Sequence, residues 1–301
     1  MRHSRPLLVA LLALASPLAA QGASASYVPP PSSRAIEYHA ISDPEGALMG
    51  YYSALLIFAP DGAPSPAKPW TVDLAVNLGY VPPLSYDQRT AGRDKPEATN
   101  ITAVFGYPKV TLWFPYQIGL TAAYTPPIDV GGGKPYIYAF SLEALAVSTP
   151  SISIVPRITY TGGYIQAPIT CNKNLSTSGN ESFEFYWATV CNARESTDRL
   201  EPNQWSFELN ATGSWLEGRL LPFAGAGVVQ YKTTFDIQVQ TGSGIDTDHP
   251  ILKMNSTEGY GMLGATWVAS PLWRFGTALF WEPGSVFTGR VSATLRLNGK
   301  C

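Results

Sequence analysis

Few side chains in this chain of 301 residues have the types and spacing that catalysis requires. His39 and Ser53 lie 14 positions apart, and a serine hydrolase would pair such a hydroxyl with an imidazole. No G-x-S-x-G nucleophile elbow accompanies them. A single histidine in a predicted strand is more often a hydrogen-bonding group than a base. We therefore predict no catalytic residue and no enzyme, and keep an envelope hydrolase as an alternative.

Two glycine-rich segments have the letters of nucleotide-binding loops but lack the context that such loops need. Residues 259–264 fit G-x-G-x-x-G, but that motif must open a helix, and the following Ala265-Thr266-Trp267 continues as a strand. Residues 131–134 read G-G-G-K without the spacing of a P-loop. His39 and His249 are two histidines for which no carboxylate cluster is expected, and we predict that they make a poor metal site. We therefore predict no cofactor and no metal ion.

The charge balance excludes a nucleic-acid partner. Lys and Arg number 20 against 22 for Asp and Glu, so no basic excess is available to neutralise a phosphate backbone. Charged residues make up only 14% of the chain, but 45% of it is hydrophobic, which argues against disorder.

The N-terminal residues predict secretion. Arg2 and Arg5 precede the apolar run 7–14, and small residues follow at 16–20. This order is typical of a cleaved signal peptide over residues 1–20, with 21–33 as an N-terminal periplasmic segment. In an oxidising compartment Cys171 and Cys191 could form a disulfide, whereas Cys301 has no obvious partner.

The dominant pattern is an alternation of apolar and polar residues. From Trp205 to Trp215, odd positions are apolar or small and even positions are polar, and segments 70–80 and 287–297 alternate in the same way. At about 3.3 Å per residue, an eleven-residue strand is about 33 Å long and, tilted by about 40°, spans about 25 Å. That height matches the apolar band of a membrane barrel.

Twelve strands are predicted in this way, at 34–42, 47–58, 69–80, 99–107, 109–125, 135–147, 151–165, 204–215, 219–235, 256–269, 272–282 and 285–297. With both termini in the periplasm, the connections sort by side. Tight turns fall at Tyr107-Pro108, 148–150, 216–218 and 270–271, and the longest opposite connections are the outer loops 81–98 and 166–203. Short turns on one side and long loops on the other are expected of outer-membrane barrels. The predicted fold is all-β: one antiparallel up-and-down transmembrane barrel over 34–298.

In this architecture the chain resembles a bacterial outer-membrane β-barrel protein of porin-like type, although no family-specific motif matches. The resemblance implies a location in the bacterial outer membrane, with the lipid bilayer and small solutes as partners. The oligomeric state stays open.

The alternation assigns side chains to the two faces of the wall. Polar residues of the strands are the lumen candidates: Glu37, His39, Asp73, Asn77, Glu143, Arg157, Glu208, Asn210, Arg290 and Arg296. Aromatic residues near strand ends are the candidates for the membrane interfaces: Trp70, Tyr80, Trp205, Trp215, Trp267 and Trp281. Ala224, Ala226 and Val228 are assigned to the lumen as apolar positions that could line a route for a hydrophobic solute.

The favoured function is therefore a passive channel for small solutes, with lumen charges that tune its selectivity. One alternative is a barrel that is not a pore and acts in surface structure or recognition through its outer loops. A second is a secreted soluble β-sandwich or an envelope hydrolase.

Overall fold

The computed structural model describes residues 34–90, 102–129, 131–171, 191, 194–241, 244–246 and 250–297. All of them belong to one compact unit that begins at Arg34. The predicted signal peptide 1–20, the segment 21–33, most of the outer loop 166–203, residues 91–98 of the other outer loop, His249 and Cys301 lie outside the described residues.

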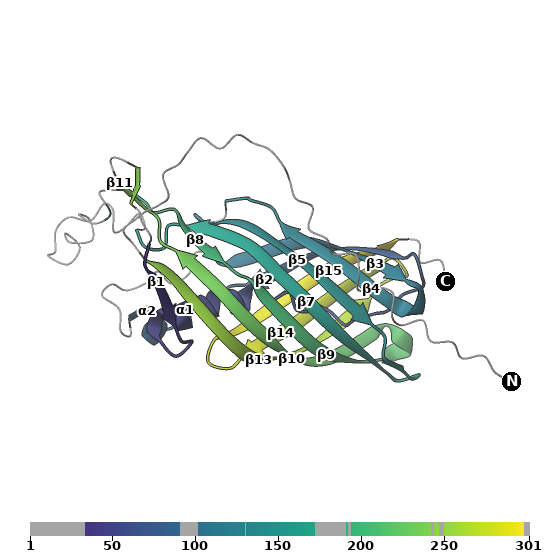
Figure 1. Cartoon of the computed structure of the whole chain (residues 1–301). Helices are drawn as coiled ribbons and strands as arrows, with labels where there is room; N and C mark the ends of the chain where they lie inside the picture. Colours follow the sequence, from purple (N-terminus) through teal and green to yellow (C-terminus); the bar gives the residue numbers. More distant parts are fainter. Residues whose placement is uncertain are drawn as a thin grey trace, which may run out of the picture. The chain divides into compact units, whose positions relative to one another are not determined.

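Ten antiparallel strands form a closed ring in this unit (Figure 1). In ring order they are β2 (Val72–Tyr80), β3 (Val104–Phe114), β4 (Ile118–Thr125), β5 (Lys134–Ala144), β7 (Ile152–Ala167), β9 (Gln204–Gly213), β10 (Leu220–Asp236), β13 (Ile251–Val268), β14 (Trp273–Glu282) and β15 (Val286–Leu297). Each strand pairs with the next, and β15 closes the ring on β2 from Leu297↔Val72 to Arg290↔Gly79. The predicted all-β, antiparallel, up-and-down barrel is confirmed.

The strand count of twelve is wrong, because the first two predicted strands are not part of the ring. Segment 34–42 contains only the short β1 (Ile36–His39), which runs parallel to the start of β13. Segment 47–58 lies mainly in a helix, α1 (Pro44–Leu55). Asp43 before Pro44 is a sequence signal for a helix start, since proline suits the first helical turn. Eight of the remaining ten predicted segments each correspond to one ring strand, whereas 99–107 and 109–125 cover β3 and β4 but divide them at the wrong place.

One predicted turn is also misplaced. Tyr107-Pro108 lies within β3, and the chain reverses instead at the short 3-10 turn η1 (Pro115–Gln117). Tyr116 and Gln117 both adopt positive φ there, 65° and 58°. The predicted turn at 216–218 is confirmed as η2 (Leu216–Gly218).

The connections sort by length between the two ends of the barrel. At the turn end they are short, covering 115–117, 145–151, 214–219 and 269–272. At the loop end they are 81–103, 126–133, 168–203, 237–250 and the short 283–285. The loop end carries the remaining small elements: α2 (Tyr86–Thr90), β8 (Asp198–Glu201), β11 (Val239–Thr241) and β12 (Gly244–Asp246), while β6 (Val147–Ser148) lies at the turn end.

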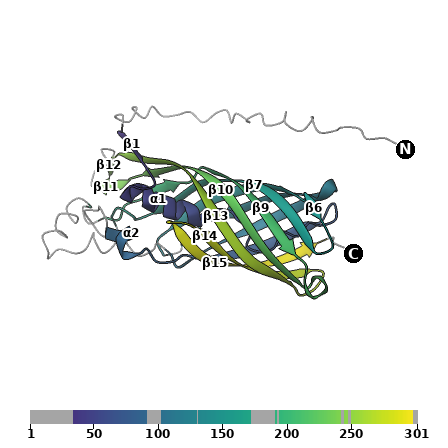
Figure 2. The same ribbon diagram turned by 90° about the horizontal axis from the view of Figure 1, so that it is seen from below.

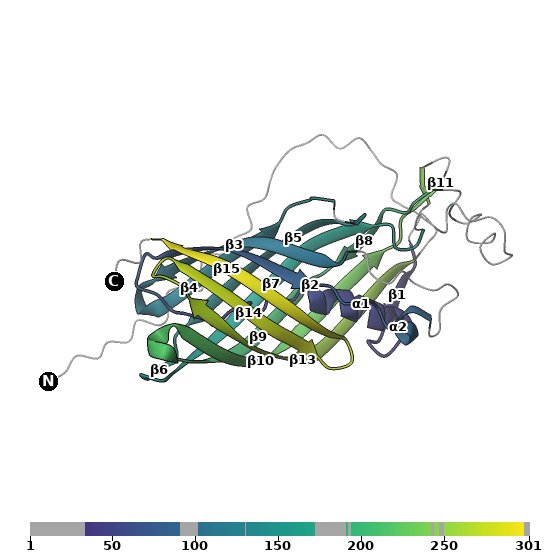
Figure 3. The ribbon, with the colours of Figure 1, turned by 180° about the vertical axis from the view of Figure 1, so that it is seen from behind.

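The N-terminal part of this unit occupies the inside of the ring. Figures 2 and 3 show α1 among the strands near the loop end, with the chain continuing from it toward the start of β2. Residues Tyr51, Ala54, Ile57, Ala59 and Asp61 are at most 4% exposed. We call residues 44–69, which comprise α1 and this extended continuation, the plug.

Candidate functional site

The inward face of the wall carries most of the charged residues that the alternation assigns to it. Eight of the ten lumen candidates are buried on ring strands: Asp73, Asn77, Glu143, Arg157, Glu208, Asn210, Arg290 and Arg296. Glu37 and His39 are placed differently, because β1 lies outside the ring, and Glu37 is exposed. The assignment of those two residues to the lumen is therefore corrected.

His39 lies in acidic surroundings that the sequence analysis did not anticipate. Its ring nitrogens are 3.7 Å from Glu37, 4.0 Å from Asp43 and 3.7 Å from Glu45. Among the described residues, no group of three or more His, Cys, Asp or Glu side chains has a geometry that could hold a metal ion. Ser53 is on α1, and its hydroxyl is 2.7 Å from that of Thr233.

The apolar lumen face predicted for 219–235 is also corrected. Ala224, Ala226 and Val228 face outward, and Phe223, Val229 and Tyr231 face inward. Both alternating sets are small or apolar over residues 220–229, so the alternation there could not orient the strand. Its register with β9 and β13 sets its face instead.

Polar groups of the wall bind the backbone of the plug at successive positions. Arg290 Nη1 donates to the Ile57 carbonyl at 2.8 Å, and Ser292 Oγ donates to the Asp61 carbonyl at 3.0 Å. Arg296 Nη2 donates to the Ser65 carbonyl at 2.8 Å. The Ala63 amide donates to Thr266 Oγ1 at 2.8 Å. A buried backbone outside a sheet needs such partners, and the wall side chains supply them.

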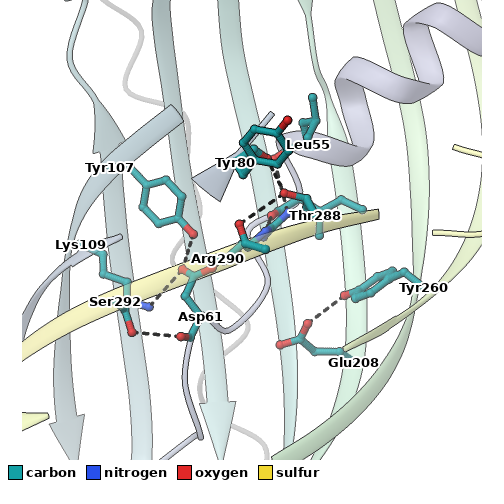
Figure 4. Close-up of polar contacts among 12 residues, drawn as sticks. Leu55, Asp61, Tyr80, Tyr107, Lys109, Glu208, Tyr260, Thr288, Arg290 and Ser292 are labelled. Atoms are coloured by element: carbon teal, nitrogen blue, oxygen red, sulfur yellow. Dashed lines mark hydrogen bonds and ion pairs between the residues drawn. The ribbon is translucent and has the colours of Figure 1, made fainter. Parts of the chain in front are cut away.

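Asp61 is the charged centre of the contact between plug and wall (Figure 4). Tyr107 Oη donates to Asp61 Oδ2 at 2.6 Å. Lys109 Nζ lies 3.9 Å from the same oxygen, and Arg290 Nη1 lies 3.8 Å from Oδ1. The carboxylate is 1% exposed, so two wall cations and a hydroxyl replace its hydration. This arrangement attaches the plug electrostatically to β3 and β15.

Two further charged groups organise the wall itself. Arg296 binds Asp73 through Nε at 2.7 Å and Nη2 at 2.6 Å, and Trp113 Nε1 donates to Asp73 at 2.9 Å. Glu208 lies 3.4 Å from Arg157 and accepts a hydrogen bond from Tyr260 Oη at 2.9 Å (Figure 4). These contacts pair the buried charges across neighbouring strands.

The surroundings of α1 near the loop end are mainly apolar. Met49, Tyr51, Ala54 and Leu55 of α1 pack in one cluster with inward side chains of β10, β13 and β14, among them Tyr231, Met254, Tyr260 and Phe280. A helix that is apolar on all sides is suited to such burial. Burial raises the pKa of Tyr51, whose hydroxyl donates to the Pro82 carbonyl.

On its other side α1 borders a cavity of about 290 Å³. The helix contributes Tyr52, Leu55 and Leu56, and the remaining lining comes from the loop-end parts of β2 to β5, β7 and their connections: Leu78, Val81, Thr102, Val104, Phe105, Gly106, Thr125, Pro126, Ile128, Gly133, Pro135, Ile137 and Ile165. Thr and Tyr hydroxyls are the only polar side-chain groups among these residues. We call this cavity the apolar pocket. An apolar cavity of ~150 Å³ in a protein core holds benzene, so this pocket has room for a larger apolar molecule.

The lumen toward the turn end is polar in contrast. A cavity of about 90 Å³ lies between the plug and the wall, and Asp73, Lys109, Glu143 and Arg157 are among its lining residues. On this side Ser141 Oγ and Asn210 Oδ1 are buried and have no protein hydrogen-bond partner within the described part of the chain. Buried polar groups of this kind bind water, so this half of the lumen is suited to water and ions.

The sequence analysis missed the plug and with it Asp61, because it predicts wall strands at 47–58 and 69–80 and leaves 59–68 as the connection between them on the periplasmic side. One signal for it exists. Residues 60–69 contain four prolines, which lack an amide donor and favour extended backbone. Such a segment can run through a barrel interior with few donors to satisfy. The pocket residues Leu55 and Leu56 were missed for the same reason, since 47–58 was assigned to the wall.

The structure joins Cys171 to Cys191 by a disulfide, with a Cα–Cα distance of 5.6 Å. Both residues are buried against Val239 at the loop end. The pairing is the one proposed from the sequence.

The outer face of the ring is apolar and bounded by aromatic side chains. On β2, Leu74, Val76 and Leu78 are between 41 and 55% exposed, while the alternate residues are buried. The six predicted interfacial aromatics are 44–63% exposed: Tyr80, Trp205 and Trp281 near the loop end, and Trp70, Trp215 and Trp267 near the turn end. Two aromatic belts enclosing an apolar band are characteristic of a wall in lipid. Among the described residues no helix is long and apolar enough to cross a membrane.

These features define the chain as a transmembrane β-barrel of the bacterial outer-membrane type. No protein-family model matches the sequence, and no curated protein matches it.

Solved structures with a similar fold include the attachment invasion locus protein Ail of Yersinia pestis, at 8% identity and a TM-score of 0.31, covering 76% of this chain and 100% of Ail. The Acinetobacter baumannii outer membrane protein Omp33 has 10% identity and a TM-score of 0.31, with 76% and 98% covered. The Pseudomonas putida toluene transporter TodX has 11% identity and a TM-score of 0.30, with 86% and 71% covered. The assignment to this class therefore depends on the ring, its apolar face and its belts, and these likenesses carry no argument about function.

Proposed function

We propose that this chain is a plugged barrel of the bacterial outer membrane that binds small apolar solutes at its outer end and takes them up. The observation that carries the proposal is the apolar pocket between α1 and the wall, whose lining is almost entirely hydrocarbon. Pockets that bind small molecules are mostly apolar, with few polar groups. The loop end is taken to face outward because long loops are extracellular in this class.

A permanently open passive channel is a weaker proposal, because the plug occupies the lumen. Residues 49–61 include many side chains with almost no exposed surface, and wall side chains bind their backbone. Small polar solutes would cross only after the plug had moved. The favoured solute therefore changes from a polar to an apolar one.

Binding can be measured with naphthalene, a small rigid hydrocarbon. Radiolabelled naphthalene is equilibrated by dialysis with the full barrel in lipid nanodiscs, and empty nanodiscs measure its partition into lipid. We expect saturable binding above that partition. Leu56→Asn should weaken binding about tenfold, because a buried amide without a partner costs roughly 1–3 kcal/mol in an apolar site.

Leu216→Asn is the matched control, since Leu216 is 63% exposed in η2 at the opposite end of the barrel. It should bind naphthalene as the unaltered chain does. Binding no greater than that of empty nanodiscs, or equal loss in both variants, would exclude the pocket as a solute site.

A further inference from the structure

We infer that the apolar pocket opens sideways through the wall between β3 and β4, so that its solute exchanges with the lipid hydrocarbon rather than along the barrel axis. The nature of the solute rests on the proposed function. The opening itself rests on strand register, on the residues that line the pocket, and on the polarity of the axial route.

The ladder between β3 and β4 stops short of the loop end. Its register runs from Phe114↔Ile118 to Lys109↔Ala123. Beyond that point β3 stays paired with β2 as far as Val104↔Tyr80, and β4 stays paired with β5 as far as Thr125↔Ile137. Among the residues that the structure describes, Val104–Pro108 therefore have a neighbouring strand on one side only.

Two residues within Val104–Pro108 explain why the pairing between β3 and β4 ends here. Pro108 is the neighbour of Lys109, the last residue of β3 that pairs with β4. Proline has no amide hydrogen to donate, and within sheets it is found where a strand lacks a neighbour on one side. Gly106 has no side chain to cover the gap. A Cβ atom there would lie 2.7 Å from Leu78 Cδ2, the movable end of a lining side chain.

The pocket is lined from both faces of the wall. Leu78 and Val104 face outward and are 52% and 51% exposed. Ile137 faces inward from β5 and Leu55 lies inside the ring on α1, and each is 4% exposed. A cavity bounded by lipid-facing and lumen-facing side chains must cross the wall. Tyr80 and Tyr124, which are 51% and 47% exposed, flank the opening and place it at the outer margin of the hydrocarbon.

The axial route would be unfavourable for an apolar solute. On the turn-end side of the pocket it would meet the plug and the Asp61, Lys109 and Arg290 charges, and then a polar cavity. Apolar surface moved into such surroundings loses its favourable transfer free energy. The lateral route keeps the solute in contact with hydrocarbon throughout.

The opening can be tested by the access of lipid to a probe in the pocket. A bimane label is attached to a single cysteine in a Cys301→Ser background, in bilayers that contain nitroxide-labelled phospholipid with iodide as the aqueous quencher. Ile137→Cys faces the pocket. Ser141→Cys faces the lumen from the same strand, and Phe140→Cys faces lipid. Heat-modifiable mobility of each labelled barrel shows that it is folded.

We expect lipid quenching at 137 to be at least half of that at 140, and quenching at 141 to be several-fold weaker. Quenching at 137 as weak as at 141 would overturn the lateral opening. The naphthalene measurement is independent of this result. Binding without lipid access at 137 defeats only the opening, whereas access without binding defeats only the proposed solute.

A second variant tests passage through the gap. Gly106→Val fills the unpaired stretch and should slow naphthalene exchange several-fold with little change in its equilibrium binding. Gly289→Val is the control, because nothing lies within 4 Å of a Cβ atom at Gly289. Equal exchange rates in the two variants would contradict passage between β3 and β4.

Discussion

Asp61 shows how one residue can determine whether this barrel is closed. Its carboxylate is the acidic partner of Lys109 and Arg290 and accepts a hydrogen bond from the Tyr107 hydroxyl. The same arginine also donates to the Ile57 carbonyl, so one side chain binds two parts of the plug. These ion pairs and hydrogen bonds hold the plug against the wall.

Asp61→Asn should therefore open the lumen. Removing one partner of a buried charged group costs about 3–5 kcal/mol, because the remaining cations lose their counter-charge. In planar bilayers we expect the unaltered barrel to conduct at background level and the variant to show discrete openings.

Glu37→Gln provides the control for this prediction, since Glu37 is exposed on β1 and lies outside the ring. It should remain closed. A silent Asp61→Asn barrel that folds normally would show that Asp61 does not hold the plug in place.

At the scale of elements, the plug depends on close backbone approach as well as on charge. A Cβ atom at Gly276 of β14 would lie 2.6 Å from the Asp61 carbonyl oxygen and 2.9 Å from Gly62 Cα. Both contacts are with backbone, which cannot rotate away as a side chain can. Gly276 on the wall and Gly62 on the plug together let the two backbone segments touch.

Gly276→Val should consequently displace the plug from β14. We expect the thiol of Ala63→Cys, at a residue that is 9% exposed, to react about tenfold faster with a water-soluble maleimide when Gly276→Val is also present. The comparison uses a Cys301→Ser background. Gly289→Val should leave the reaction rate unchanged, and equal rates in all variants would contradict the close approach.

At the scale of the whole molecule, stability depends on closure of the ring. β15 and β2 are more than 200 residues apart in the sequence, yet eight residue pairs join them. Closure pairs each ring strand on both sides over most of its length, which matters in the hydrocarbon, where an unpaired backbone group is costly. The gap beside β3 is tolerated because it lies at the loop end, beyond the paired part of that strand.

A closed ring should survive detergent without heating. We expect the unheated barrel to migrate differently from the boiled one on a detergent gel. Val291→Pro should abolish the difference, because Val291 pairs with Leu78 and with Thr277 in the closing ladders. Val291→Ala keeps the backbone donor and should retain the shift. The same mobility before and after boiling would contradict closure.

The sequence alone determined the wall. Alternation over segments such as 70–80 and 205–215 is a local consequence of strand geometry, so it revealed the ring strands and most inward charges before any contact was known. It did not orient Ala224–Val228, where both faces are small or apolar. It also read 47–58 as a strand, because a helix that is apolar all round has no polar face to reveal its period.

Only the tertiary structure placed residues 44–69 inside the ring, and with them Asp61 and the apolar pocket. Three of the hydrogen bonds that hold this segment join residues more than 200 positions apart, and no local pattern encodes such distances.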